Sequence, residues 1–251
     1  MKKRNGVTQT QTLLIMGIVF LFLFACLAVP FYNSYKQKKA LSHLMKVYAT
    51  LIQANRNYAY VTGSNLDEYD TTLPINTFAE TYFTPYFEIQ SYCKGSQSDC
   101  WDSPQYTDLK KNKFFNKSLY SIILPDKTVI GFSKNKQHLV TAIIDVDGPV
   151  GENKLGKDVF VMYFYNNLQR PNICDKEVYE KYEIKNGIHL GGFDKCGIPQ
   201  DVYDYNQLSS KNFEDGCNKS SPKNVYGNGV GSACLAFIKA SNWTIDKKYP
   251  W

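Results

Sequence analysis

An uncharged apolar run near the N-terminus limits what this chain can fold into more than any other feature. The run extends from Leu13 to Val29 and is followed by Pro30. As a helix it would span roughly 25 Å at 1.5 Å per residue, which is near the lower limit for crossing a bilayer. Basic residues at positions 2–4 precede it and favour a cytoplasmic N-terminus. The sequence therefore predicts one membrane-spanning segment.

The residues after Pro30 continue with helical periodicity. Apolar side chains recur at positions 41, 44, 48, 51 and 52, with lysines and polar residues between them. No glycine or proline interrupts positions 31–61, and Gly63 supplies a stop signal. A cleaved secretory signal would instead lead into a linker or a new domain. We therefore expect one long helix from about Gln9 to Tyr60, bent near Pro30, where a backbone N–H is missing.

The segment beyond this helix contains short strand-like runs rich in β-branched and aromatic residues. Four strands are expected, at residues 119–124, 128–132, 139–144 and 159–165. Pro125-Asp126-Lys127 supplies a hairpin turn between the first two. A short helix with an aromatic face is expected at 76–87, its rings serving the core.

The predicted fold class is therefore α+β. A long N-terminal helix, membrane-spanning in its first half and amphipathic in its second, packs on a four-stranded antiparallel sheet with disulfide-stapled C-terminal loops.

The distribution of charge argues against nucleic-acid binding. The net charge is +6, but residues 1–56 hold eight basic residues and no acidic one. The rest of the chain then has twenty-one basic residues against twenty-three acidic ones. The part of the chain after residue 56 is therefore close to neutral and has no basic stripe for phosphates, so we expect no nucleic-acid partner.

The cysteines indicate an oxidising compartment. Cys26 lies inside the apolar run, and six more follow it: Cys93, Cys100, Cys174, Cys196, Cys217 and Cys234. An even set after a membrane segment predicts three disulfides, whereas a zinc site usually shows tight C-x-x-C pairs. Pairing neighbours gives Cys93–Cys100, Cys174–Cys196 and Cys217–Cys234, and the connectivity is left open beyond Cys93–Cys100.

One loop of the head is rich in turn residues and in oxygen ligands. It reads DVDGPVGENKLGKD from position 145 to 158. Glycine, proline and aspartate favour turns, and a structural turn is the favoured interpretation. Several oxygen ligands at short spacing also suit calcium, although the EF-hand pattern is not met. The candidate ligands are Asp145, Asp147, Asn153 and Asp158, and no other cofactor is expected.

The N-terminal residues resemble those of type IV pilins and type II secretion pseudopilins. In that family a prepilin peptidase cuts after a glycine that ends a short basic leader, and a helix containing a proline follows. Gly6 resembles that glycine, Val7 the mature first residue, which the family often N-methylates, and Pro30 the helix proline, two positions late. Gln11 stands where most members have a glutamate that pairs with a neighbour's N-terminal amine. Residues 145–158 and 234–251 resemble segments of pilin-like secretion proteins.

The resemblance implies a leader at 1–6, an assembly helix at 7–60 and a pilin-like head at 61–251. It implies a structural subunit in a type IV pilus or type II secretion pseudopilus, and Gln11 favours a minor one. The expected partners are the membrane, other pilin-like subunits through the N-terminal helix, and the prepilin peptidase. The expected location is the bacterial inner membrane, single-pass with a periplasmic head, or an extracellular filament after assembly.

A monomeric anchored binding protein is the alternative function. It would be held by an uncleaved helix or by lipid on Cys26, because residues 23–26 loosely resemble a lipobox. The sequence shows no nucleophile elbow, P-loop or paired histidines, and we expect no enzyme.

Overall fold

The computed structural model describes residues 9–64, 68–94, 106–113, 120–134, 139–166, 187–193, 197, 202–224, 227–246 and 249–250. The chain divides into two compact units, residues 1–39 and 40–251. We describe each unit by itself. The second unit is called the head below.

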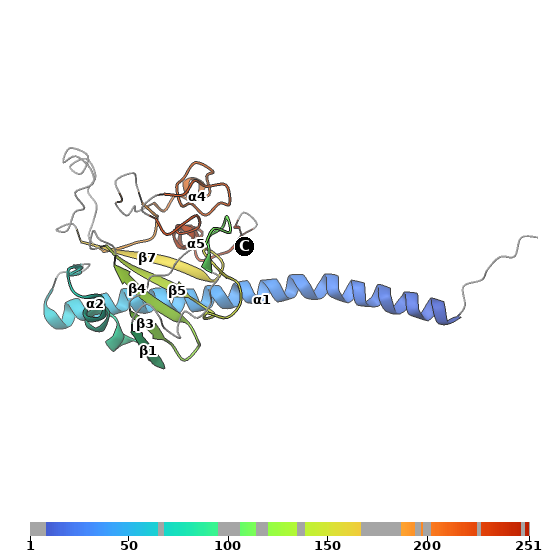
Figure 1. Cartoon of the computed structure of the whole chain (residues 1–251), viewed down its shortest axis with the longest axis horizontal. Coiled ribbons are helices and arrows are strands. Elements are labelled where there is room, and N and C mark those ends of the chain that lie inside the picture. Colours follow the sequence, from blue (N-terminus) through green and yellow to red (C-terminus); the bar gives the residue numbers. More distant parts are fainter. Residues whose placement is uncertain are drawn as a thin grey trace, which may run out of the picture. The chain divides into compact units, whose positions relative to one another are not determined.

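Helix α1 spans Gln9–Thr62 and contains Pro30 (Figure 1). This confirms the predicted long helix to within two residues of its end. In the head, α1 buries Leu44, Val47, Leu51 and Ala54 in the main core. Their spacing of three and four residues places them on one helix face, which is why this half of the helix packs on the sheet.

The main sheet is antiparallel and has six strands in the order β1-β3-β4-β5-β7-β8. The four predicted strands are its centre: β3 Tyr120–Ile123, β4 Val129–Lys134, β5 Val140–Asp145 and β7 Val159–Tyr165. The prediction of four strands was wrong, because β1 Ser91–Lys94 and β8 Gly187–His189 extend the sheet at its two edges. These short strands carry no alternating pattern of their own. They form because the outermost central strands offer unpaired backbone groups.

Each face of this sheet is buried against a different set of residues. On β5, Val140, Ala142 and Ile144 point into the core shared with α1. Ile143 lies in a second core on the opposite face, together with side chains of β7 such as Val161. This alternation follows from the two-residue period of a strand. Both faces are covered, and all seven residues of β7 are buried.

A second, two-stranded parallel sheet contributes to the covering of the second core. Strand β2, Tyr106–Thr107, pairs with β6, Asn153–Lys154. Tyr106 belongs to the second core together with Leu155, which follows β6. The loop between β5 and β7 is thereby tied to a segment that lies much earlier in the chain.

The predicted aromatic helix forms as α2, Ile75–Tyr82, followed by the 3-10 turn η1, Thr84–Tyr86. Phe78 and Phe83 are fully buried, and each lies within 6 Å of Phe164 of β7, ring centre to ring centre. These rings serve the core, as expected. Beyond the sheet follow α4, Tyr205–Leu208, and α5, Cys234–Ala240.

One disulfide joins Cys217 to Cys234 at the start of α5, and this is the pairing expected from neighbouring cysteines. Cys93 in β1 is also disulfide-bonded. Three cysteines, Cys100, Cys174 and Cys196, lie outside the described residues. The predicted pairings that include them therefore stay predictions.

Candidate functional site

The loop between β5 and β7 contains the four residues predicted as calcium ligands. Asp145 ends β5, Asn153 lies in β6, and Asp158 directly precedes β7. These three residues are buried, whereas Asp147 is exposed. The fold thus places three of the four in the interior and leaves the fourth at the surface.

The Asp145 carboxyl is fully buried and bound by a tyrosine from a distant segment. Tyr106 of β2 donates its hydroxyl hydrogen to Oδ2 at 2.6 Å. Burial raises the pKa of Asp145 well above its usual range, and the charges of Asp158 and Asp147 raise it further. Its Oδ1 has no hydrogen-bond partner among the described residues. The carboxyl therefore stays protonated to a higher pH than an exposed one, which lowers the cost of its burial.

Asp158 closes the loop through hydrogen bonds with the backbone. Its Oδ1 accepts from the Lys154 N–H at 2.6 Å, and its carbonyl accepts from the Val146 N–H at 2.9 Å. Burial raises the pKa of Asp158 to about 7, against the lowering effect of the Lys154 N–H. An aspartate that binds the backbone of its own loop is characteristic of a turn.

Asn153 is fully buried with its amide unsatisfied. Neither amide atom has a hydrogen-bond partner within the described part of the chain. Ordered water commonly satisfies such groups. The described residues contain no group of three or more His, Cys, Asp or Glu side chains placed to hold a metal ion. Calcium takes about six to eight oxygen ligands. The geometry therefore supports a structural turn, and calcium binding stays a prediction.

The same loop packs closely against the disulfide between Cys217 and Cys234. Gly156 has a φ of +77°, and a Cβ there would lie 2.5 Å from the Cys234 Sγ. The hydroxyl of Tyr249 donates a hydrogen bond to the Gly156 carbonyl. Only glycine combines this backbone conformation with so close an approach. The loop from Asp145 to Asp158 thus links the sheet, α5 and the C-terminal segment.

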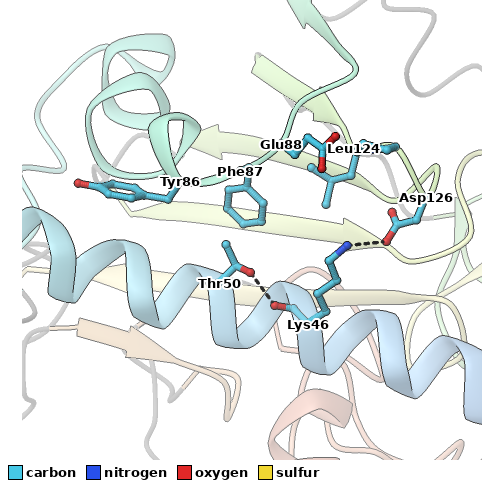
Figure 2. A pocket seen from close by; sticks show the side chains of 8 residues that line it. Lys46, Thr50, Tyr86, Phe87, Glu88, Leu124 and Asp126 are labelled. Carbon is cyan, nitrogen blue, oxygen red and sulfur yellow. Dashed lines mark hydrogen bonds and ion pairs between the residues drawn. The ribbon is translucent and has the colours of Figure 1, made fainter.

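A surface groove of about 420 Å³ lies beside α1 in the head (Figure 2). Lys46 and Thr50 line it from α1, Phe87 from the segment after η1, and Leu124 and Asp126 from the turn between β3 and β4. The Lys46 Nζ lies 3.5 Å from the Asp126 Oδ2. The lining residues come from three separate segments, so no sequence pattern identified the groove.

In the N-terminal unit, α1 exposes its apolar side chains. Phe20, Leu21 and Phe22 are each about 70% exposed. Among the described residues, α1 is the one helix long and apolar enough to cross a membrane, as judged by length and composition. Cys26 lies in this segment as a free, exposed thiol. Exposed apolar surface on this scale is rare in a soluble monomer and requires a cover.

The residues predicted for processing and assembly lie at this end of the chain. Gly6 and Val7 are outside the described residues. Gln11 and Pro30 both lie within α1, although for Gln11 the structure describes the backbone alone. Pro30 is exposed. The structure therefore leaves the processing site and the role of Gln11 as predictions.

Comparison of the chain with protein-family models, with curated proteins and with solved structures finds no match.

Proposed function

We propose that this chain is a non-catalytic, pilin-like structural subunit held in a membrane by the first half of α1. The observation that carries the proposal is one helix with two opposite environments. In its first half, large apolar side chains such as Phe20, Leu21 and Phe22 are exposed. In its second half, one face is buried against the head's own sheet through Leu44, Val47 and Leu51. A helix that serves as both anchor and assembly element needs this division.

The apolar half of α1 needs a partner that the chain itself does not supply. A helix that is apolar on all sides is stable in lipid or among other apolar helices. A membrane covers it before assembly, and neighbouring subunits cover it in a filament. The antiparallel sheet packed along the second half of the helix fits a globular head carried by such a stalk.

The charges of the helix favour a minor subunit over a major one. Lys36, Lys38 and Lys39 follow the apolar run, and the first acidic residue of the whole chain is Asp67. A filament core made of this helix alone would bring lysines together with no carboxylate to pair them, which is costly away from water. A subunit that meets different helices avoids this cost. The uncharged Gln11 is consistent with the same role.

N-terminal sequencing and intact-mass measurement of the membrane-extracted protein test the proposal. We expect a mature chain that begins at Val7 and carries an N-methyl group. Gly6→Val should leave the leader attached, whereas the control Gly17→Val should be processed normally, because nothing lies within 4 Å of a Cβ at Gly17. An intact Met1 in the wild-type chain would contradict the pilin-like assignment.

The alternative is a monomeric binding protein that does not polymerise and is anchored by an uncleaved helix or by lipid on Cys26. The observation that favours it is the free, exposed thiol of Cys26. A mature chain that begins at a lipid-modified Cys26 would establish this alternative. Loss of that mass shift in Cys26→Ser would confirm the site of attachment.

A further inference from the structure

Three aromatic residues and three lysines lie on α1 just after its apolar run. They are Phe31, Tyr32, Tyr35, Lys36, Lys38 and Lys39. All six side chains are exposed, and all belong to the N-terminal unit. We call this set the girdle.

The position of the girdle along the helix matches the edge of a bilayer. A hydrocarbon core needs about 20 helical residues, and counting from Leu13 brings that span to Tyr32. At 1.5 Å per residue, Lys36 and Lys39 then lie roughly 6 and 10 Å beyond Tyr32. This is the depth of the headgroup layer. Tyrosine is enriched at such interfaces, and lysine extends its amine toward the headgroups.

The directions of the lysines favour lipid over a single protein partner. Successive helical residues differ by about 100° around the axis, so Lys36 and Lys39 lie on one side of α1 and Lys38 points to roughly the opposite side. One packed helix covers one side, whereas a lipid annulus contacts all of them. The Lys36 amine lies 5.0 Å from the centre of the Tyr32 ring, so this cation lies close to the level of the aromatic girdle.

The girdle also lacks a counter-charge within its own segment. Residues 1–66 contain no aspartate or glutamate. The nearest fixed anions available to these lysines in a membrane are lipid phosphates. Each lysine next to an anionic membrane surface raises the association constant with that surface by about fivefold.

We propose that the girdle is a binding surface for anionic phospholipid headgroups at the end of the membrane span nearer the head. The inference rests on the membrane anchoring proposed above. It goes further by naming the lipid class and the residues that select it. The girdle sets the depth of the helix and enriches anionic lipid around the anchor.

The test uses the full chain reconstituted in phosphatidylcholine vesicles. Trace spin-labelled phosphatidylglycerol or phosphatidylcholine reports the association constant of each lipid at the protein surface. We expect the wild-type chain to prefer phosphatidylglycerol by about fivefold or more. The triple variant Lys36→Gln, Lys38→Gln, Lys39→Gln should lose most of this preference. High salt should weaken it, and free inorganic phosphate at matched ionic strength should not compete.

A matched variant separates the girdle from total charge. Lys110→Gln, Lys211→Gln, Lys219→Gln removes the same charge from exposed positions of the head and should keep the wild-type preference. An unchanged preference in the girdle variant would overturn the proposal. So would a girdle variant that keeps its lipid preference but no longer co-purifies with an acidic partner subunit. If the wild-type chain floats with vesicles but does not prefer anionic lipid, the lipid-site proposal is wrong and the membrane-anchor proposal stands. If the chain does not float, both proposals are wrong.

Discussion

The two halves of α1 have the same backbone conformation and differ in what covers their side chains. In the head, Leu44 and Leu51 have no exposed surface, because the sheet lies against them. In the N-terminal unit, Leu21 is 68% exposed, and its neighbours are similar. A buried leucine stabilises the fold by about 1.5–3 kcal/mol. Leucines of the first half contribute this energy only when a membrane or another subunit surrounds them. The second half therefore contributes to the fold of the head, and under the proposed function the first half specifies location and partners.

The largest effect is expected from removing the second half of α1. A fragment of residues 63–251 loses four fully or almost fully buried apolar residues of the main core, Leu44, Val47, Leu51 and Ala54. Their burial is worth roughly 5–8 kcal/mol together, comparable to the whole stability of a typical domain. We expect this fragment not to fold. A fragment of residues 40–251, which keeps the compact head, should fold and stay in solution. Circular dichroism after oxidative expression decides between them, and a folded 63–251 fragment would break the comparison.

A single substitution in each half gives a smaller and more specific effect. Leu51→Ala should lower the free energy of unfolding of the head by about 2–5 kcal/mol, because it leaves a cavity in the core. Leu21→Ala should change it by less than about 0.5 kcal/mol, since Leu21 belongs to the N-terminal unit and is largely exposed. Denaturant unfolding of the full chain in detergent measures both. Equal losses in the two variants would contradict the division of the helix.

A charge placed in the first half of α1 should weaken membrane insertion and leave the stability of the head unchanged. Leu21→Lys places a charge near the middle of the apolar run and should cost about 3 kcal/mol of insertion. The melting temperature of the head should not change. Vesicle flotation and head unfolding are measured on the same sample. The matched control Leu13→Lys, at the end of the run, should insert more easily than Leu21→Lys, because its amine reaches the interface. If Leu21→Lys and Leu13→Lys insert equally well, the run does not span a bilayer.

The same contrast explains how much of the fold could be predicted. The apolar run locates the first half of α1, and helical periodicity locates the second half. The four central strands are recognised by their β-branched and aromatic residues. Strands β1 and β8 form because their backbones pair with the neighbouring strands β3 and β7. Their side chains show no pattern from which a strand could be predicted. The hydrogen bond from Tyr106 to Asp145 joins residues 39 positions apart, and no local pattern encodes it. Turn residues in the loop were recognisable, but the contact of Gly156 with the disulfide requires the folded chain.

The pH dependence of stability should also distinguish the two regions. The head buries Asp158 and Asp215, whose pKa values burial raises to about 7 from 3.8. Between those values the folded state binds more protons than the unfolded state, so stability falls as pH rises. We expect the melting temperature of the head to drop by several degrees from about pH 4.5 to about pH 7.5. Vesicle association should stay constant over this range, because residues 13–29 contain no carboxylate or histidine.

A conservative variant isolates one of these carboxyls. Asp158→Asn can still accept the hydrogen bond from the Lys154 N–H, and it cannot ionise. Its melting temperature should decline less steeply with pH than that of the wild-type head. A wild-type head that becomes more stable across this range would show that the buried carboxyls are ionised and paired.

The smallest effect is expected from calcium, and it tests the remaining interpretation of the loop from Asp145 to Asp158. A cation bound there would stabilise the folded head by mass action, by about 2.7 kcal/mol at a hundred times its dissociation constant. The described carboxylates form no ligand group, and burial holds two of them toward their neutral forms, so we expect no shift in melting temperature between millimolar calcium and EDTA. A shift of several degrees that Asn153→Ala abolishes, and that the exposed-site variant Glu152→Gln retains, would make the loop a calcium site. The head would then depend on a bound cation for part of its stability.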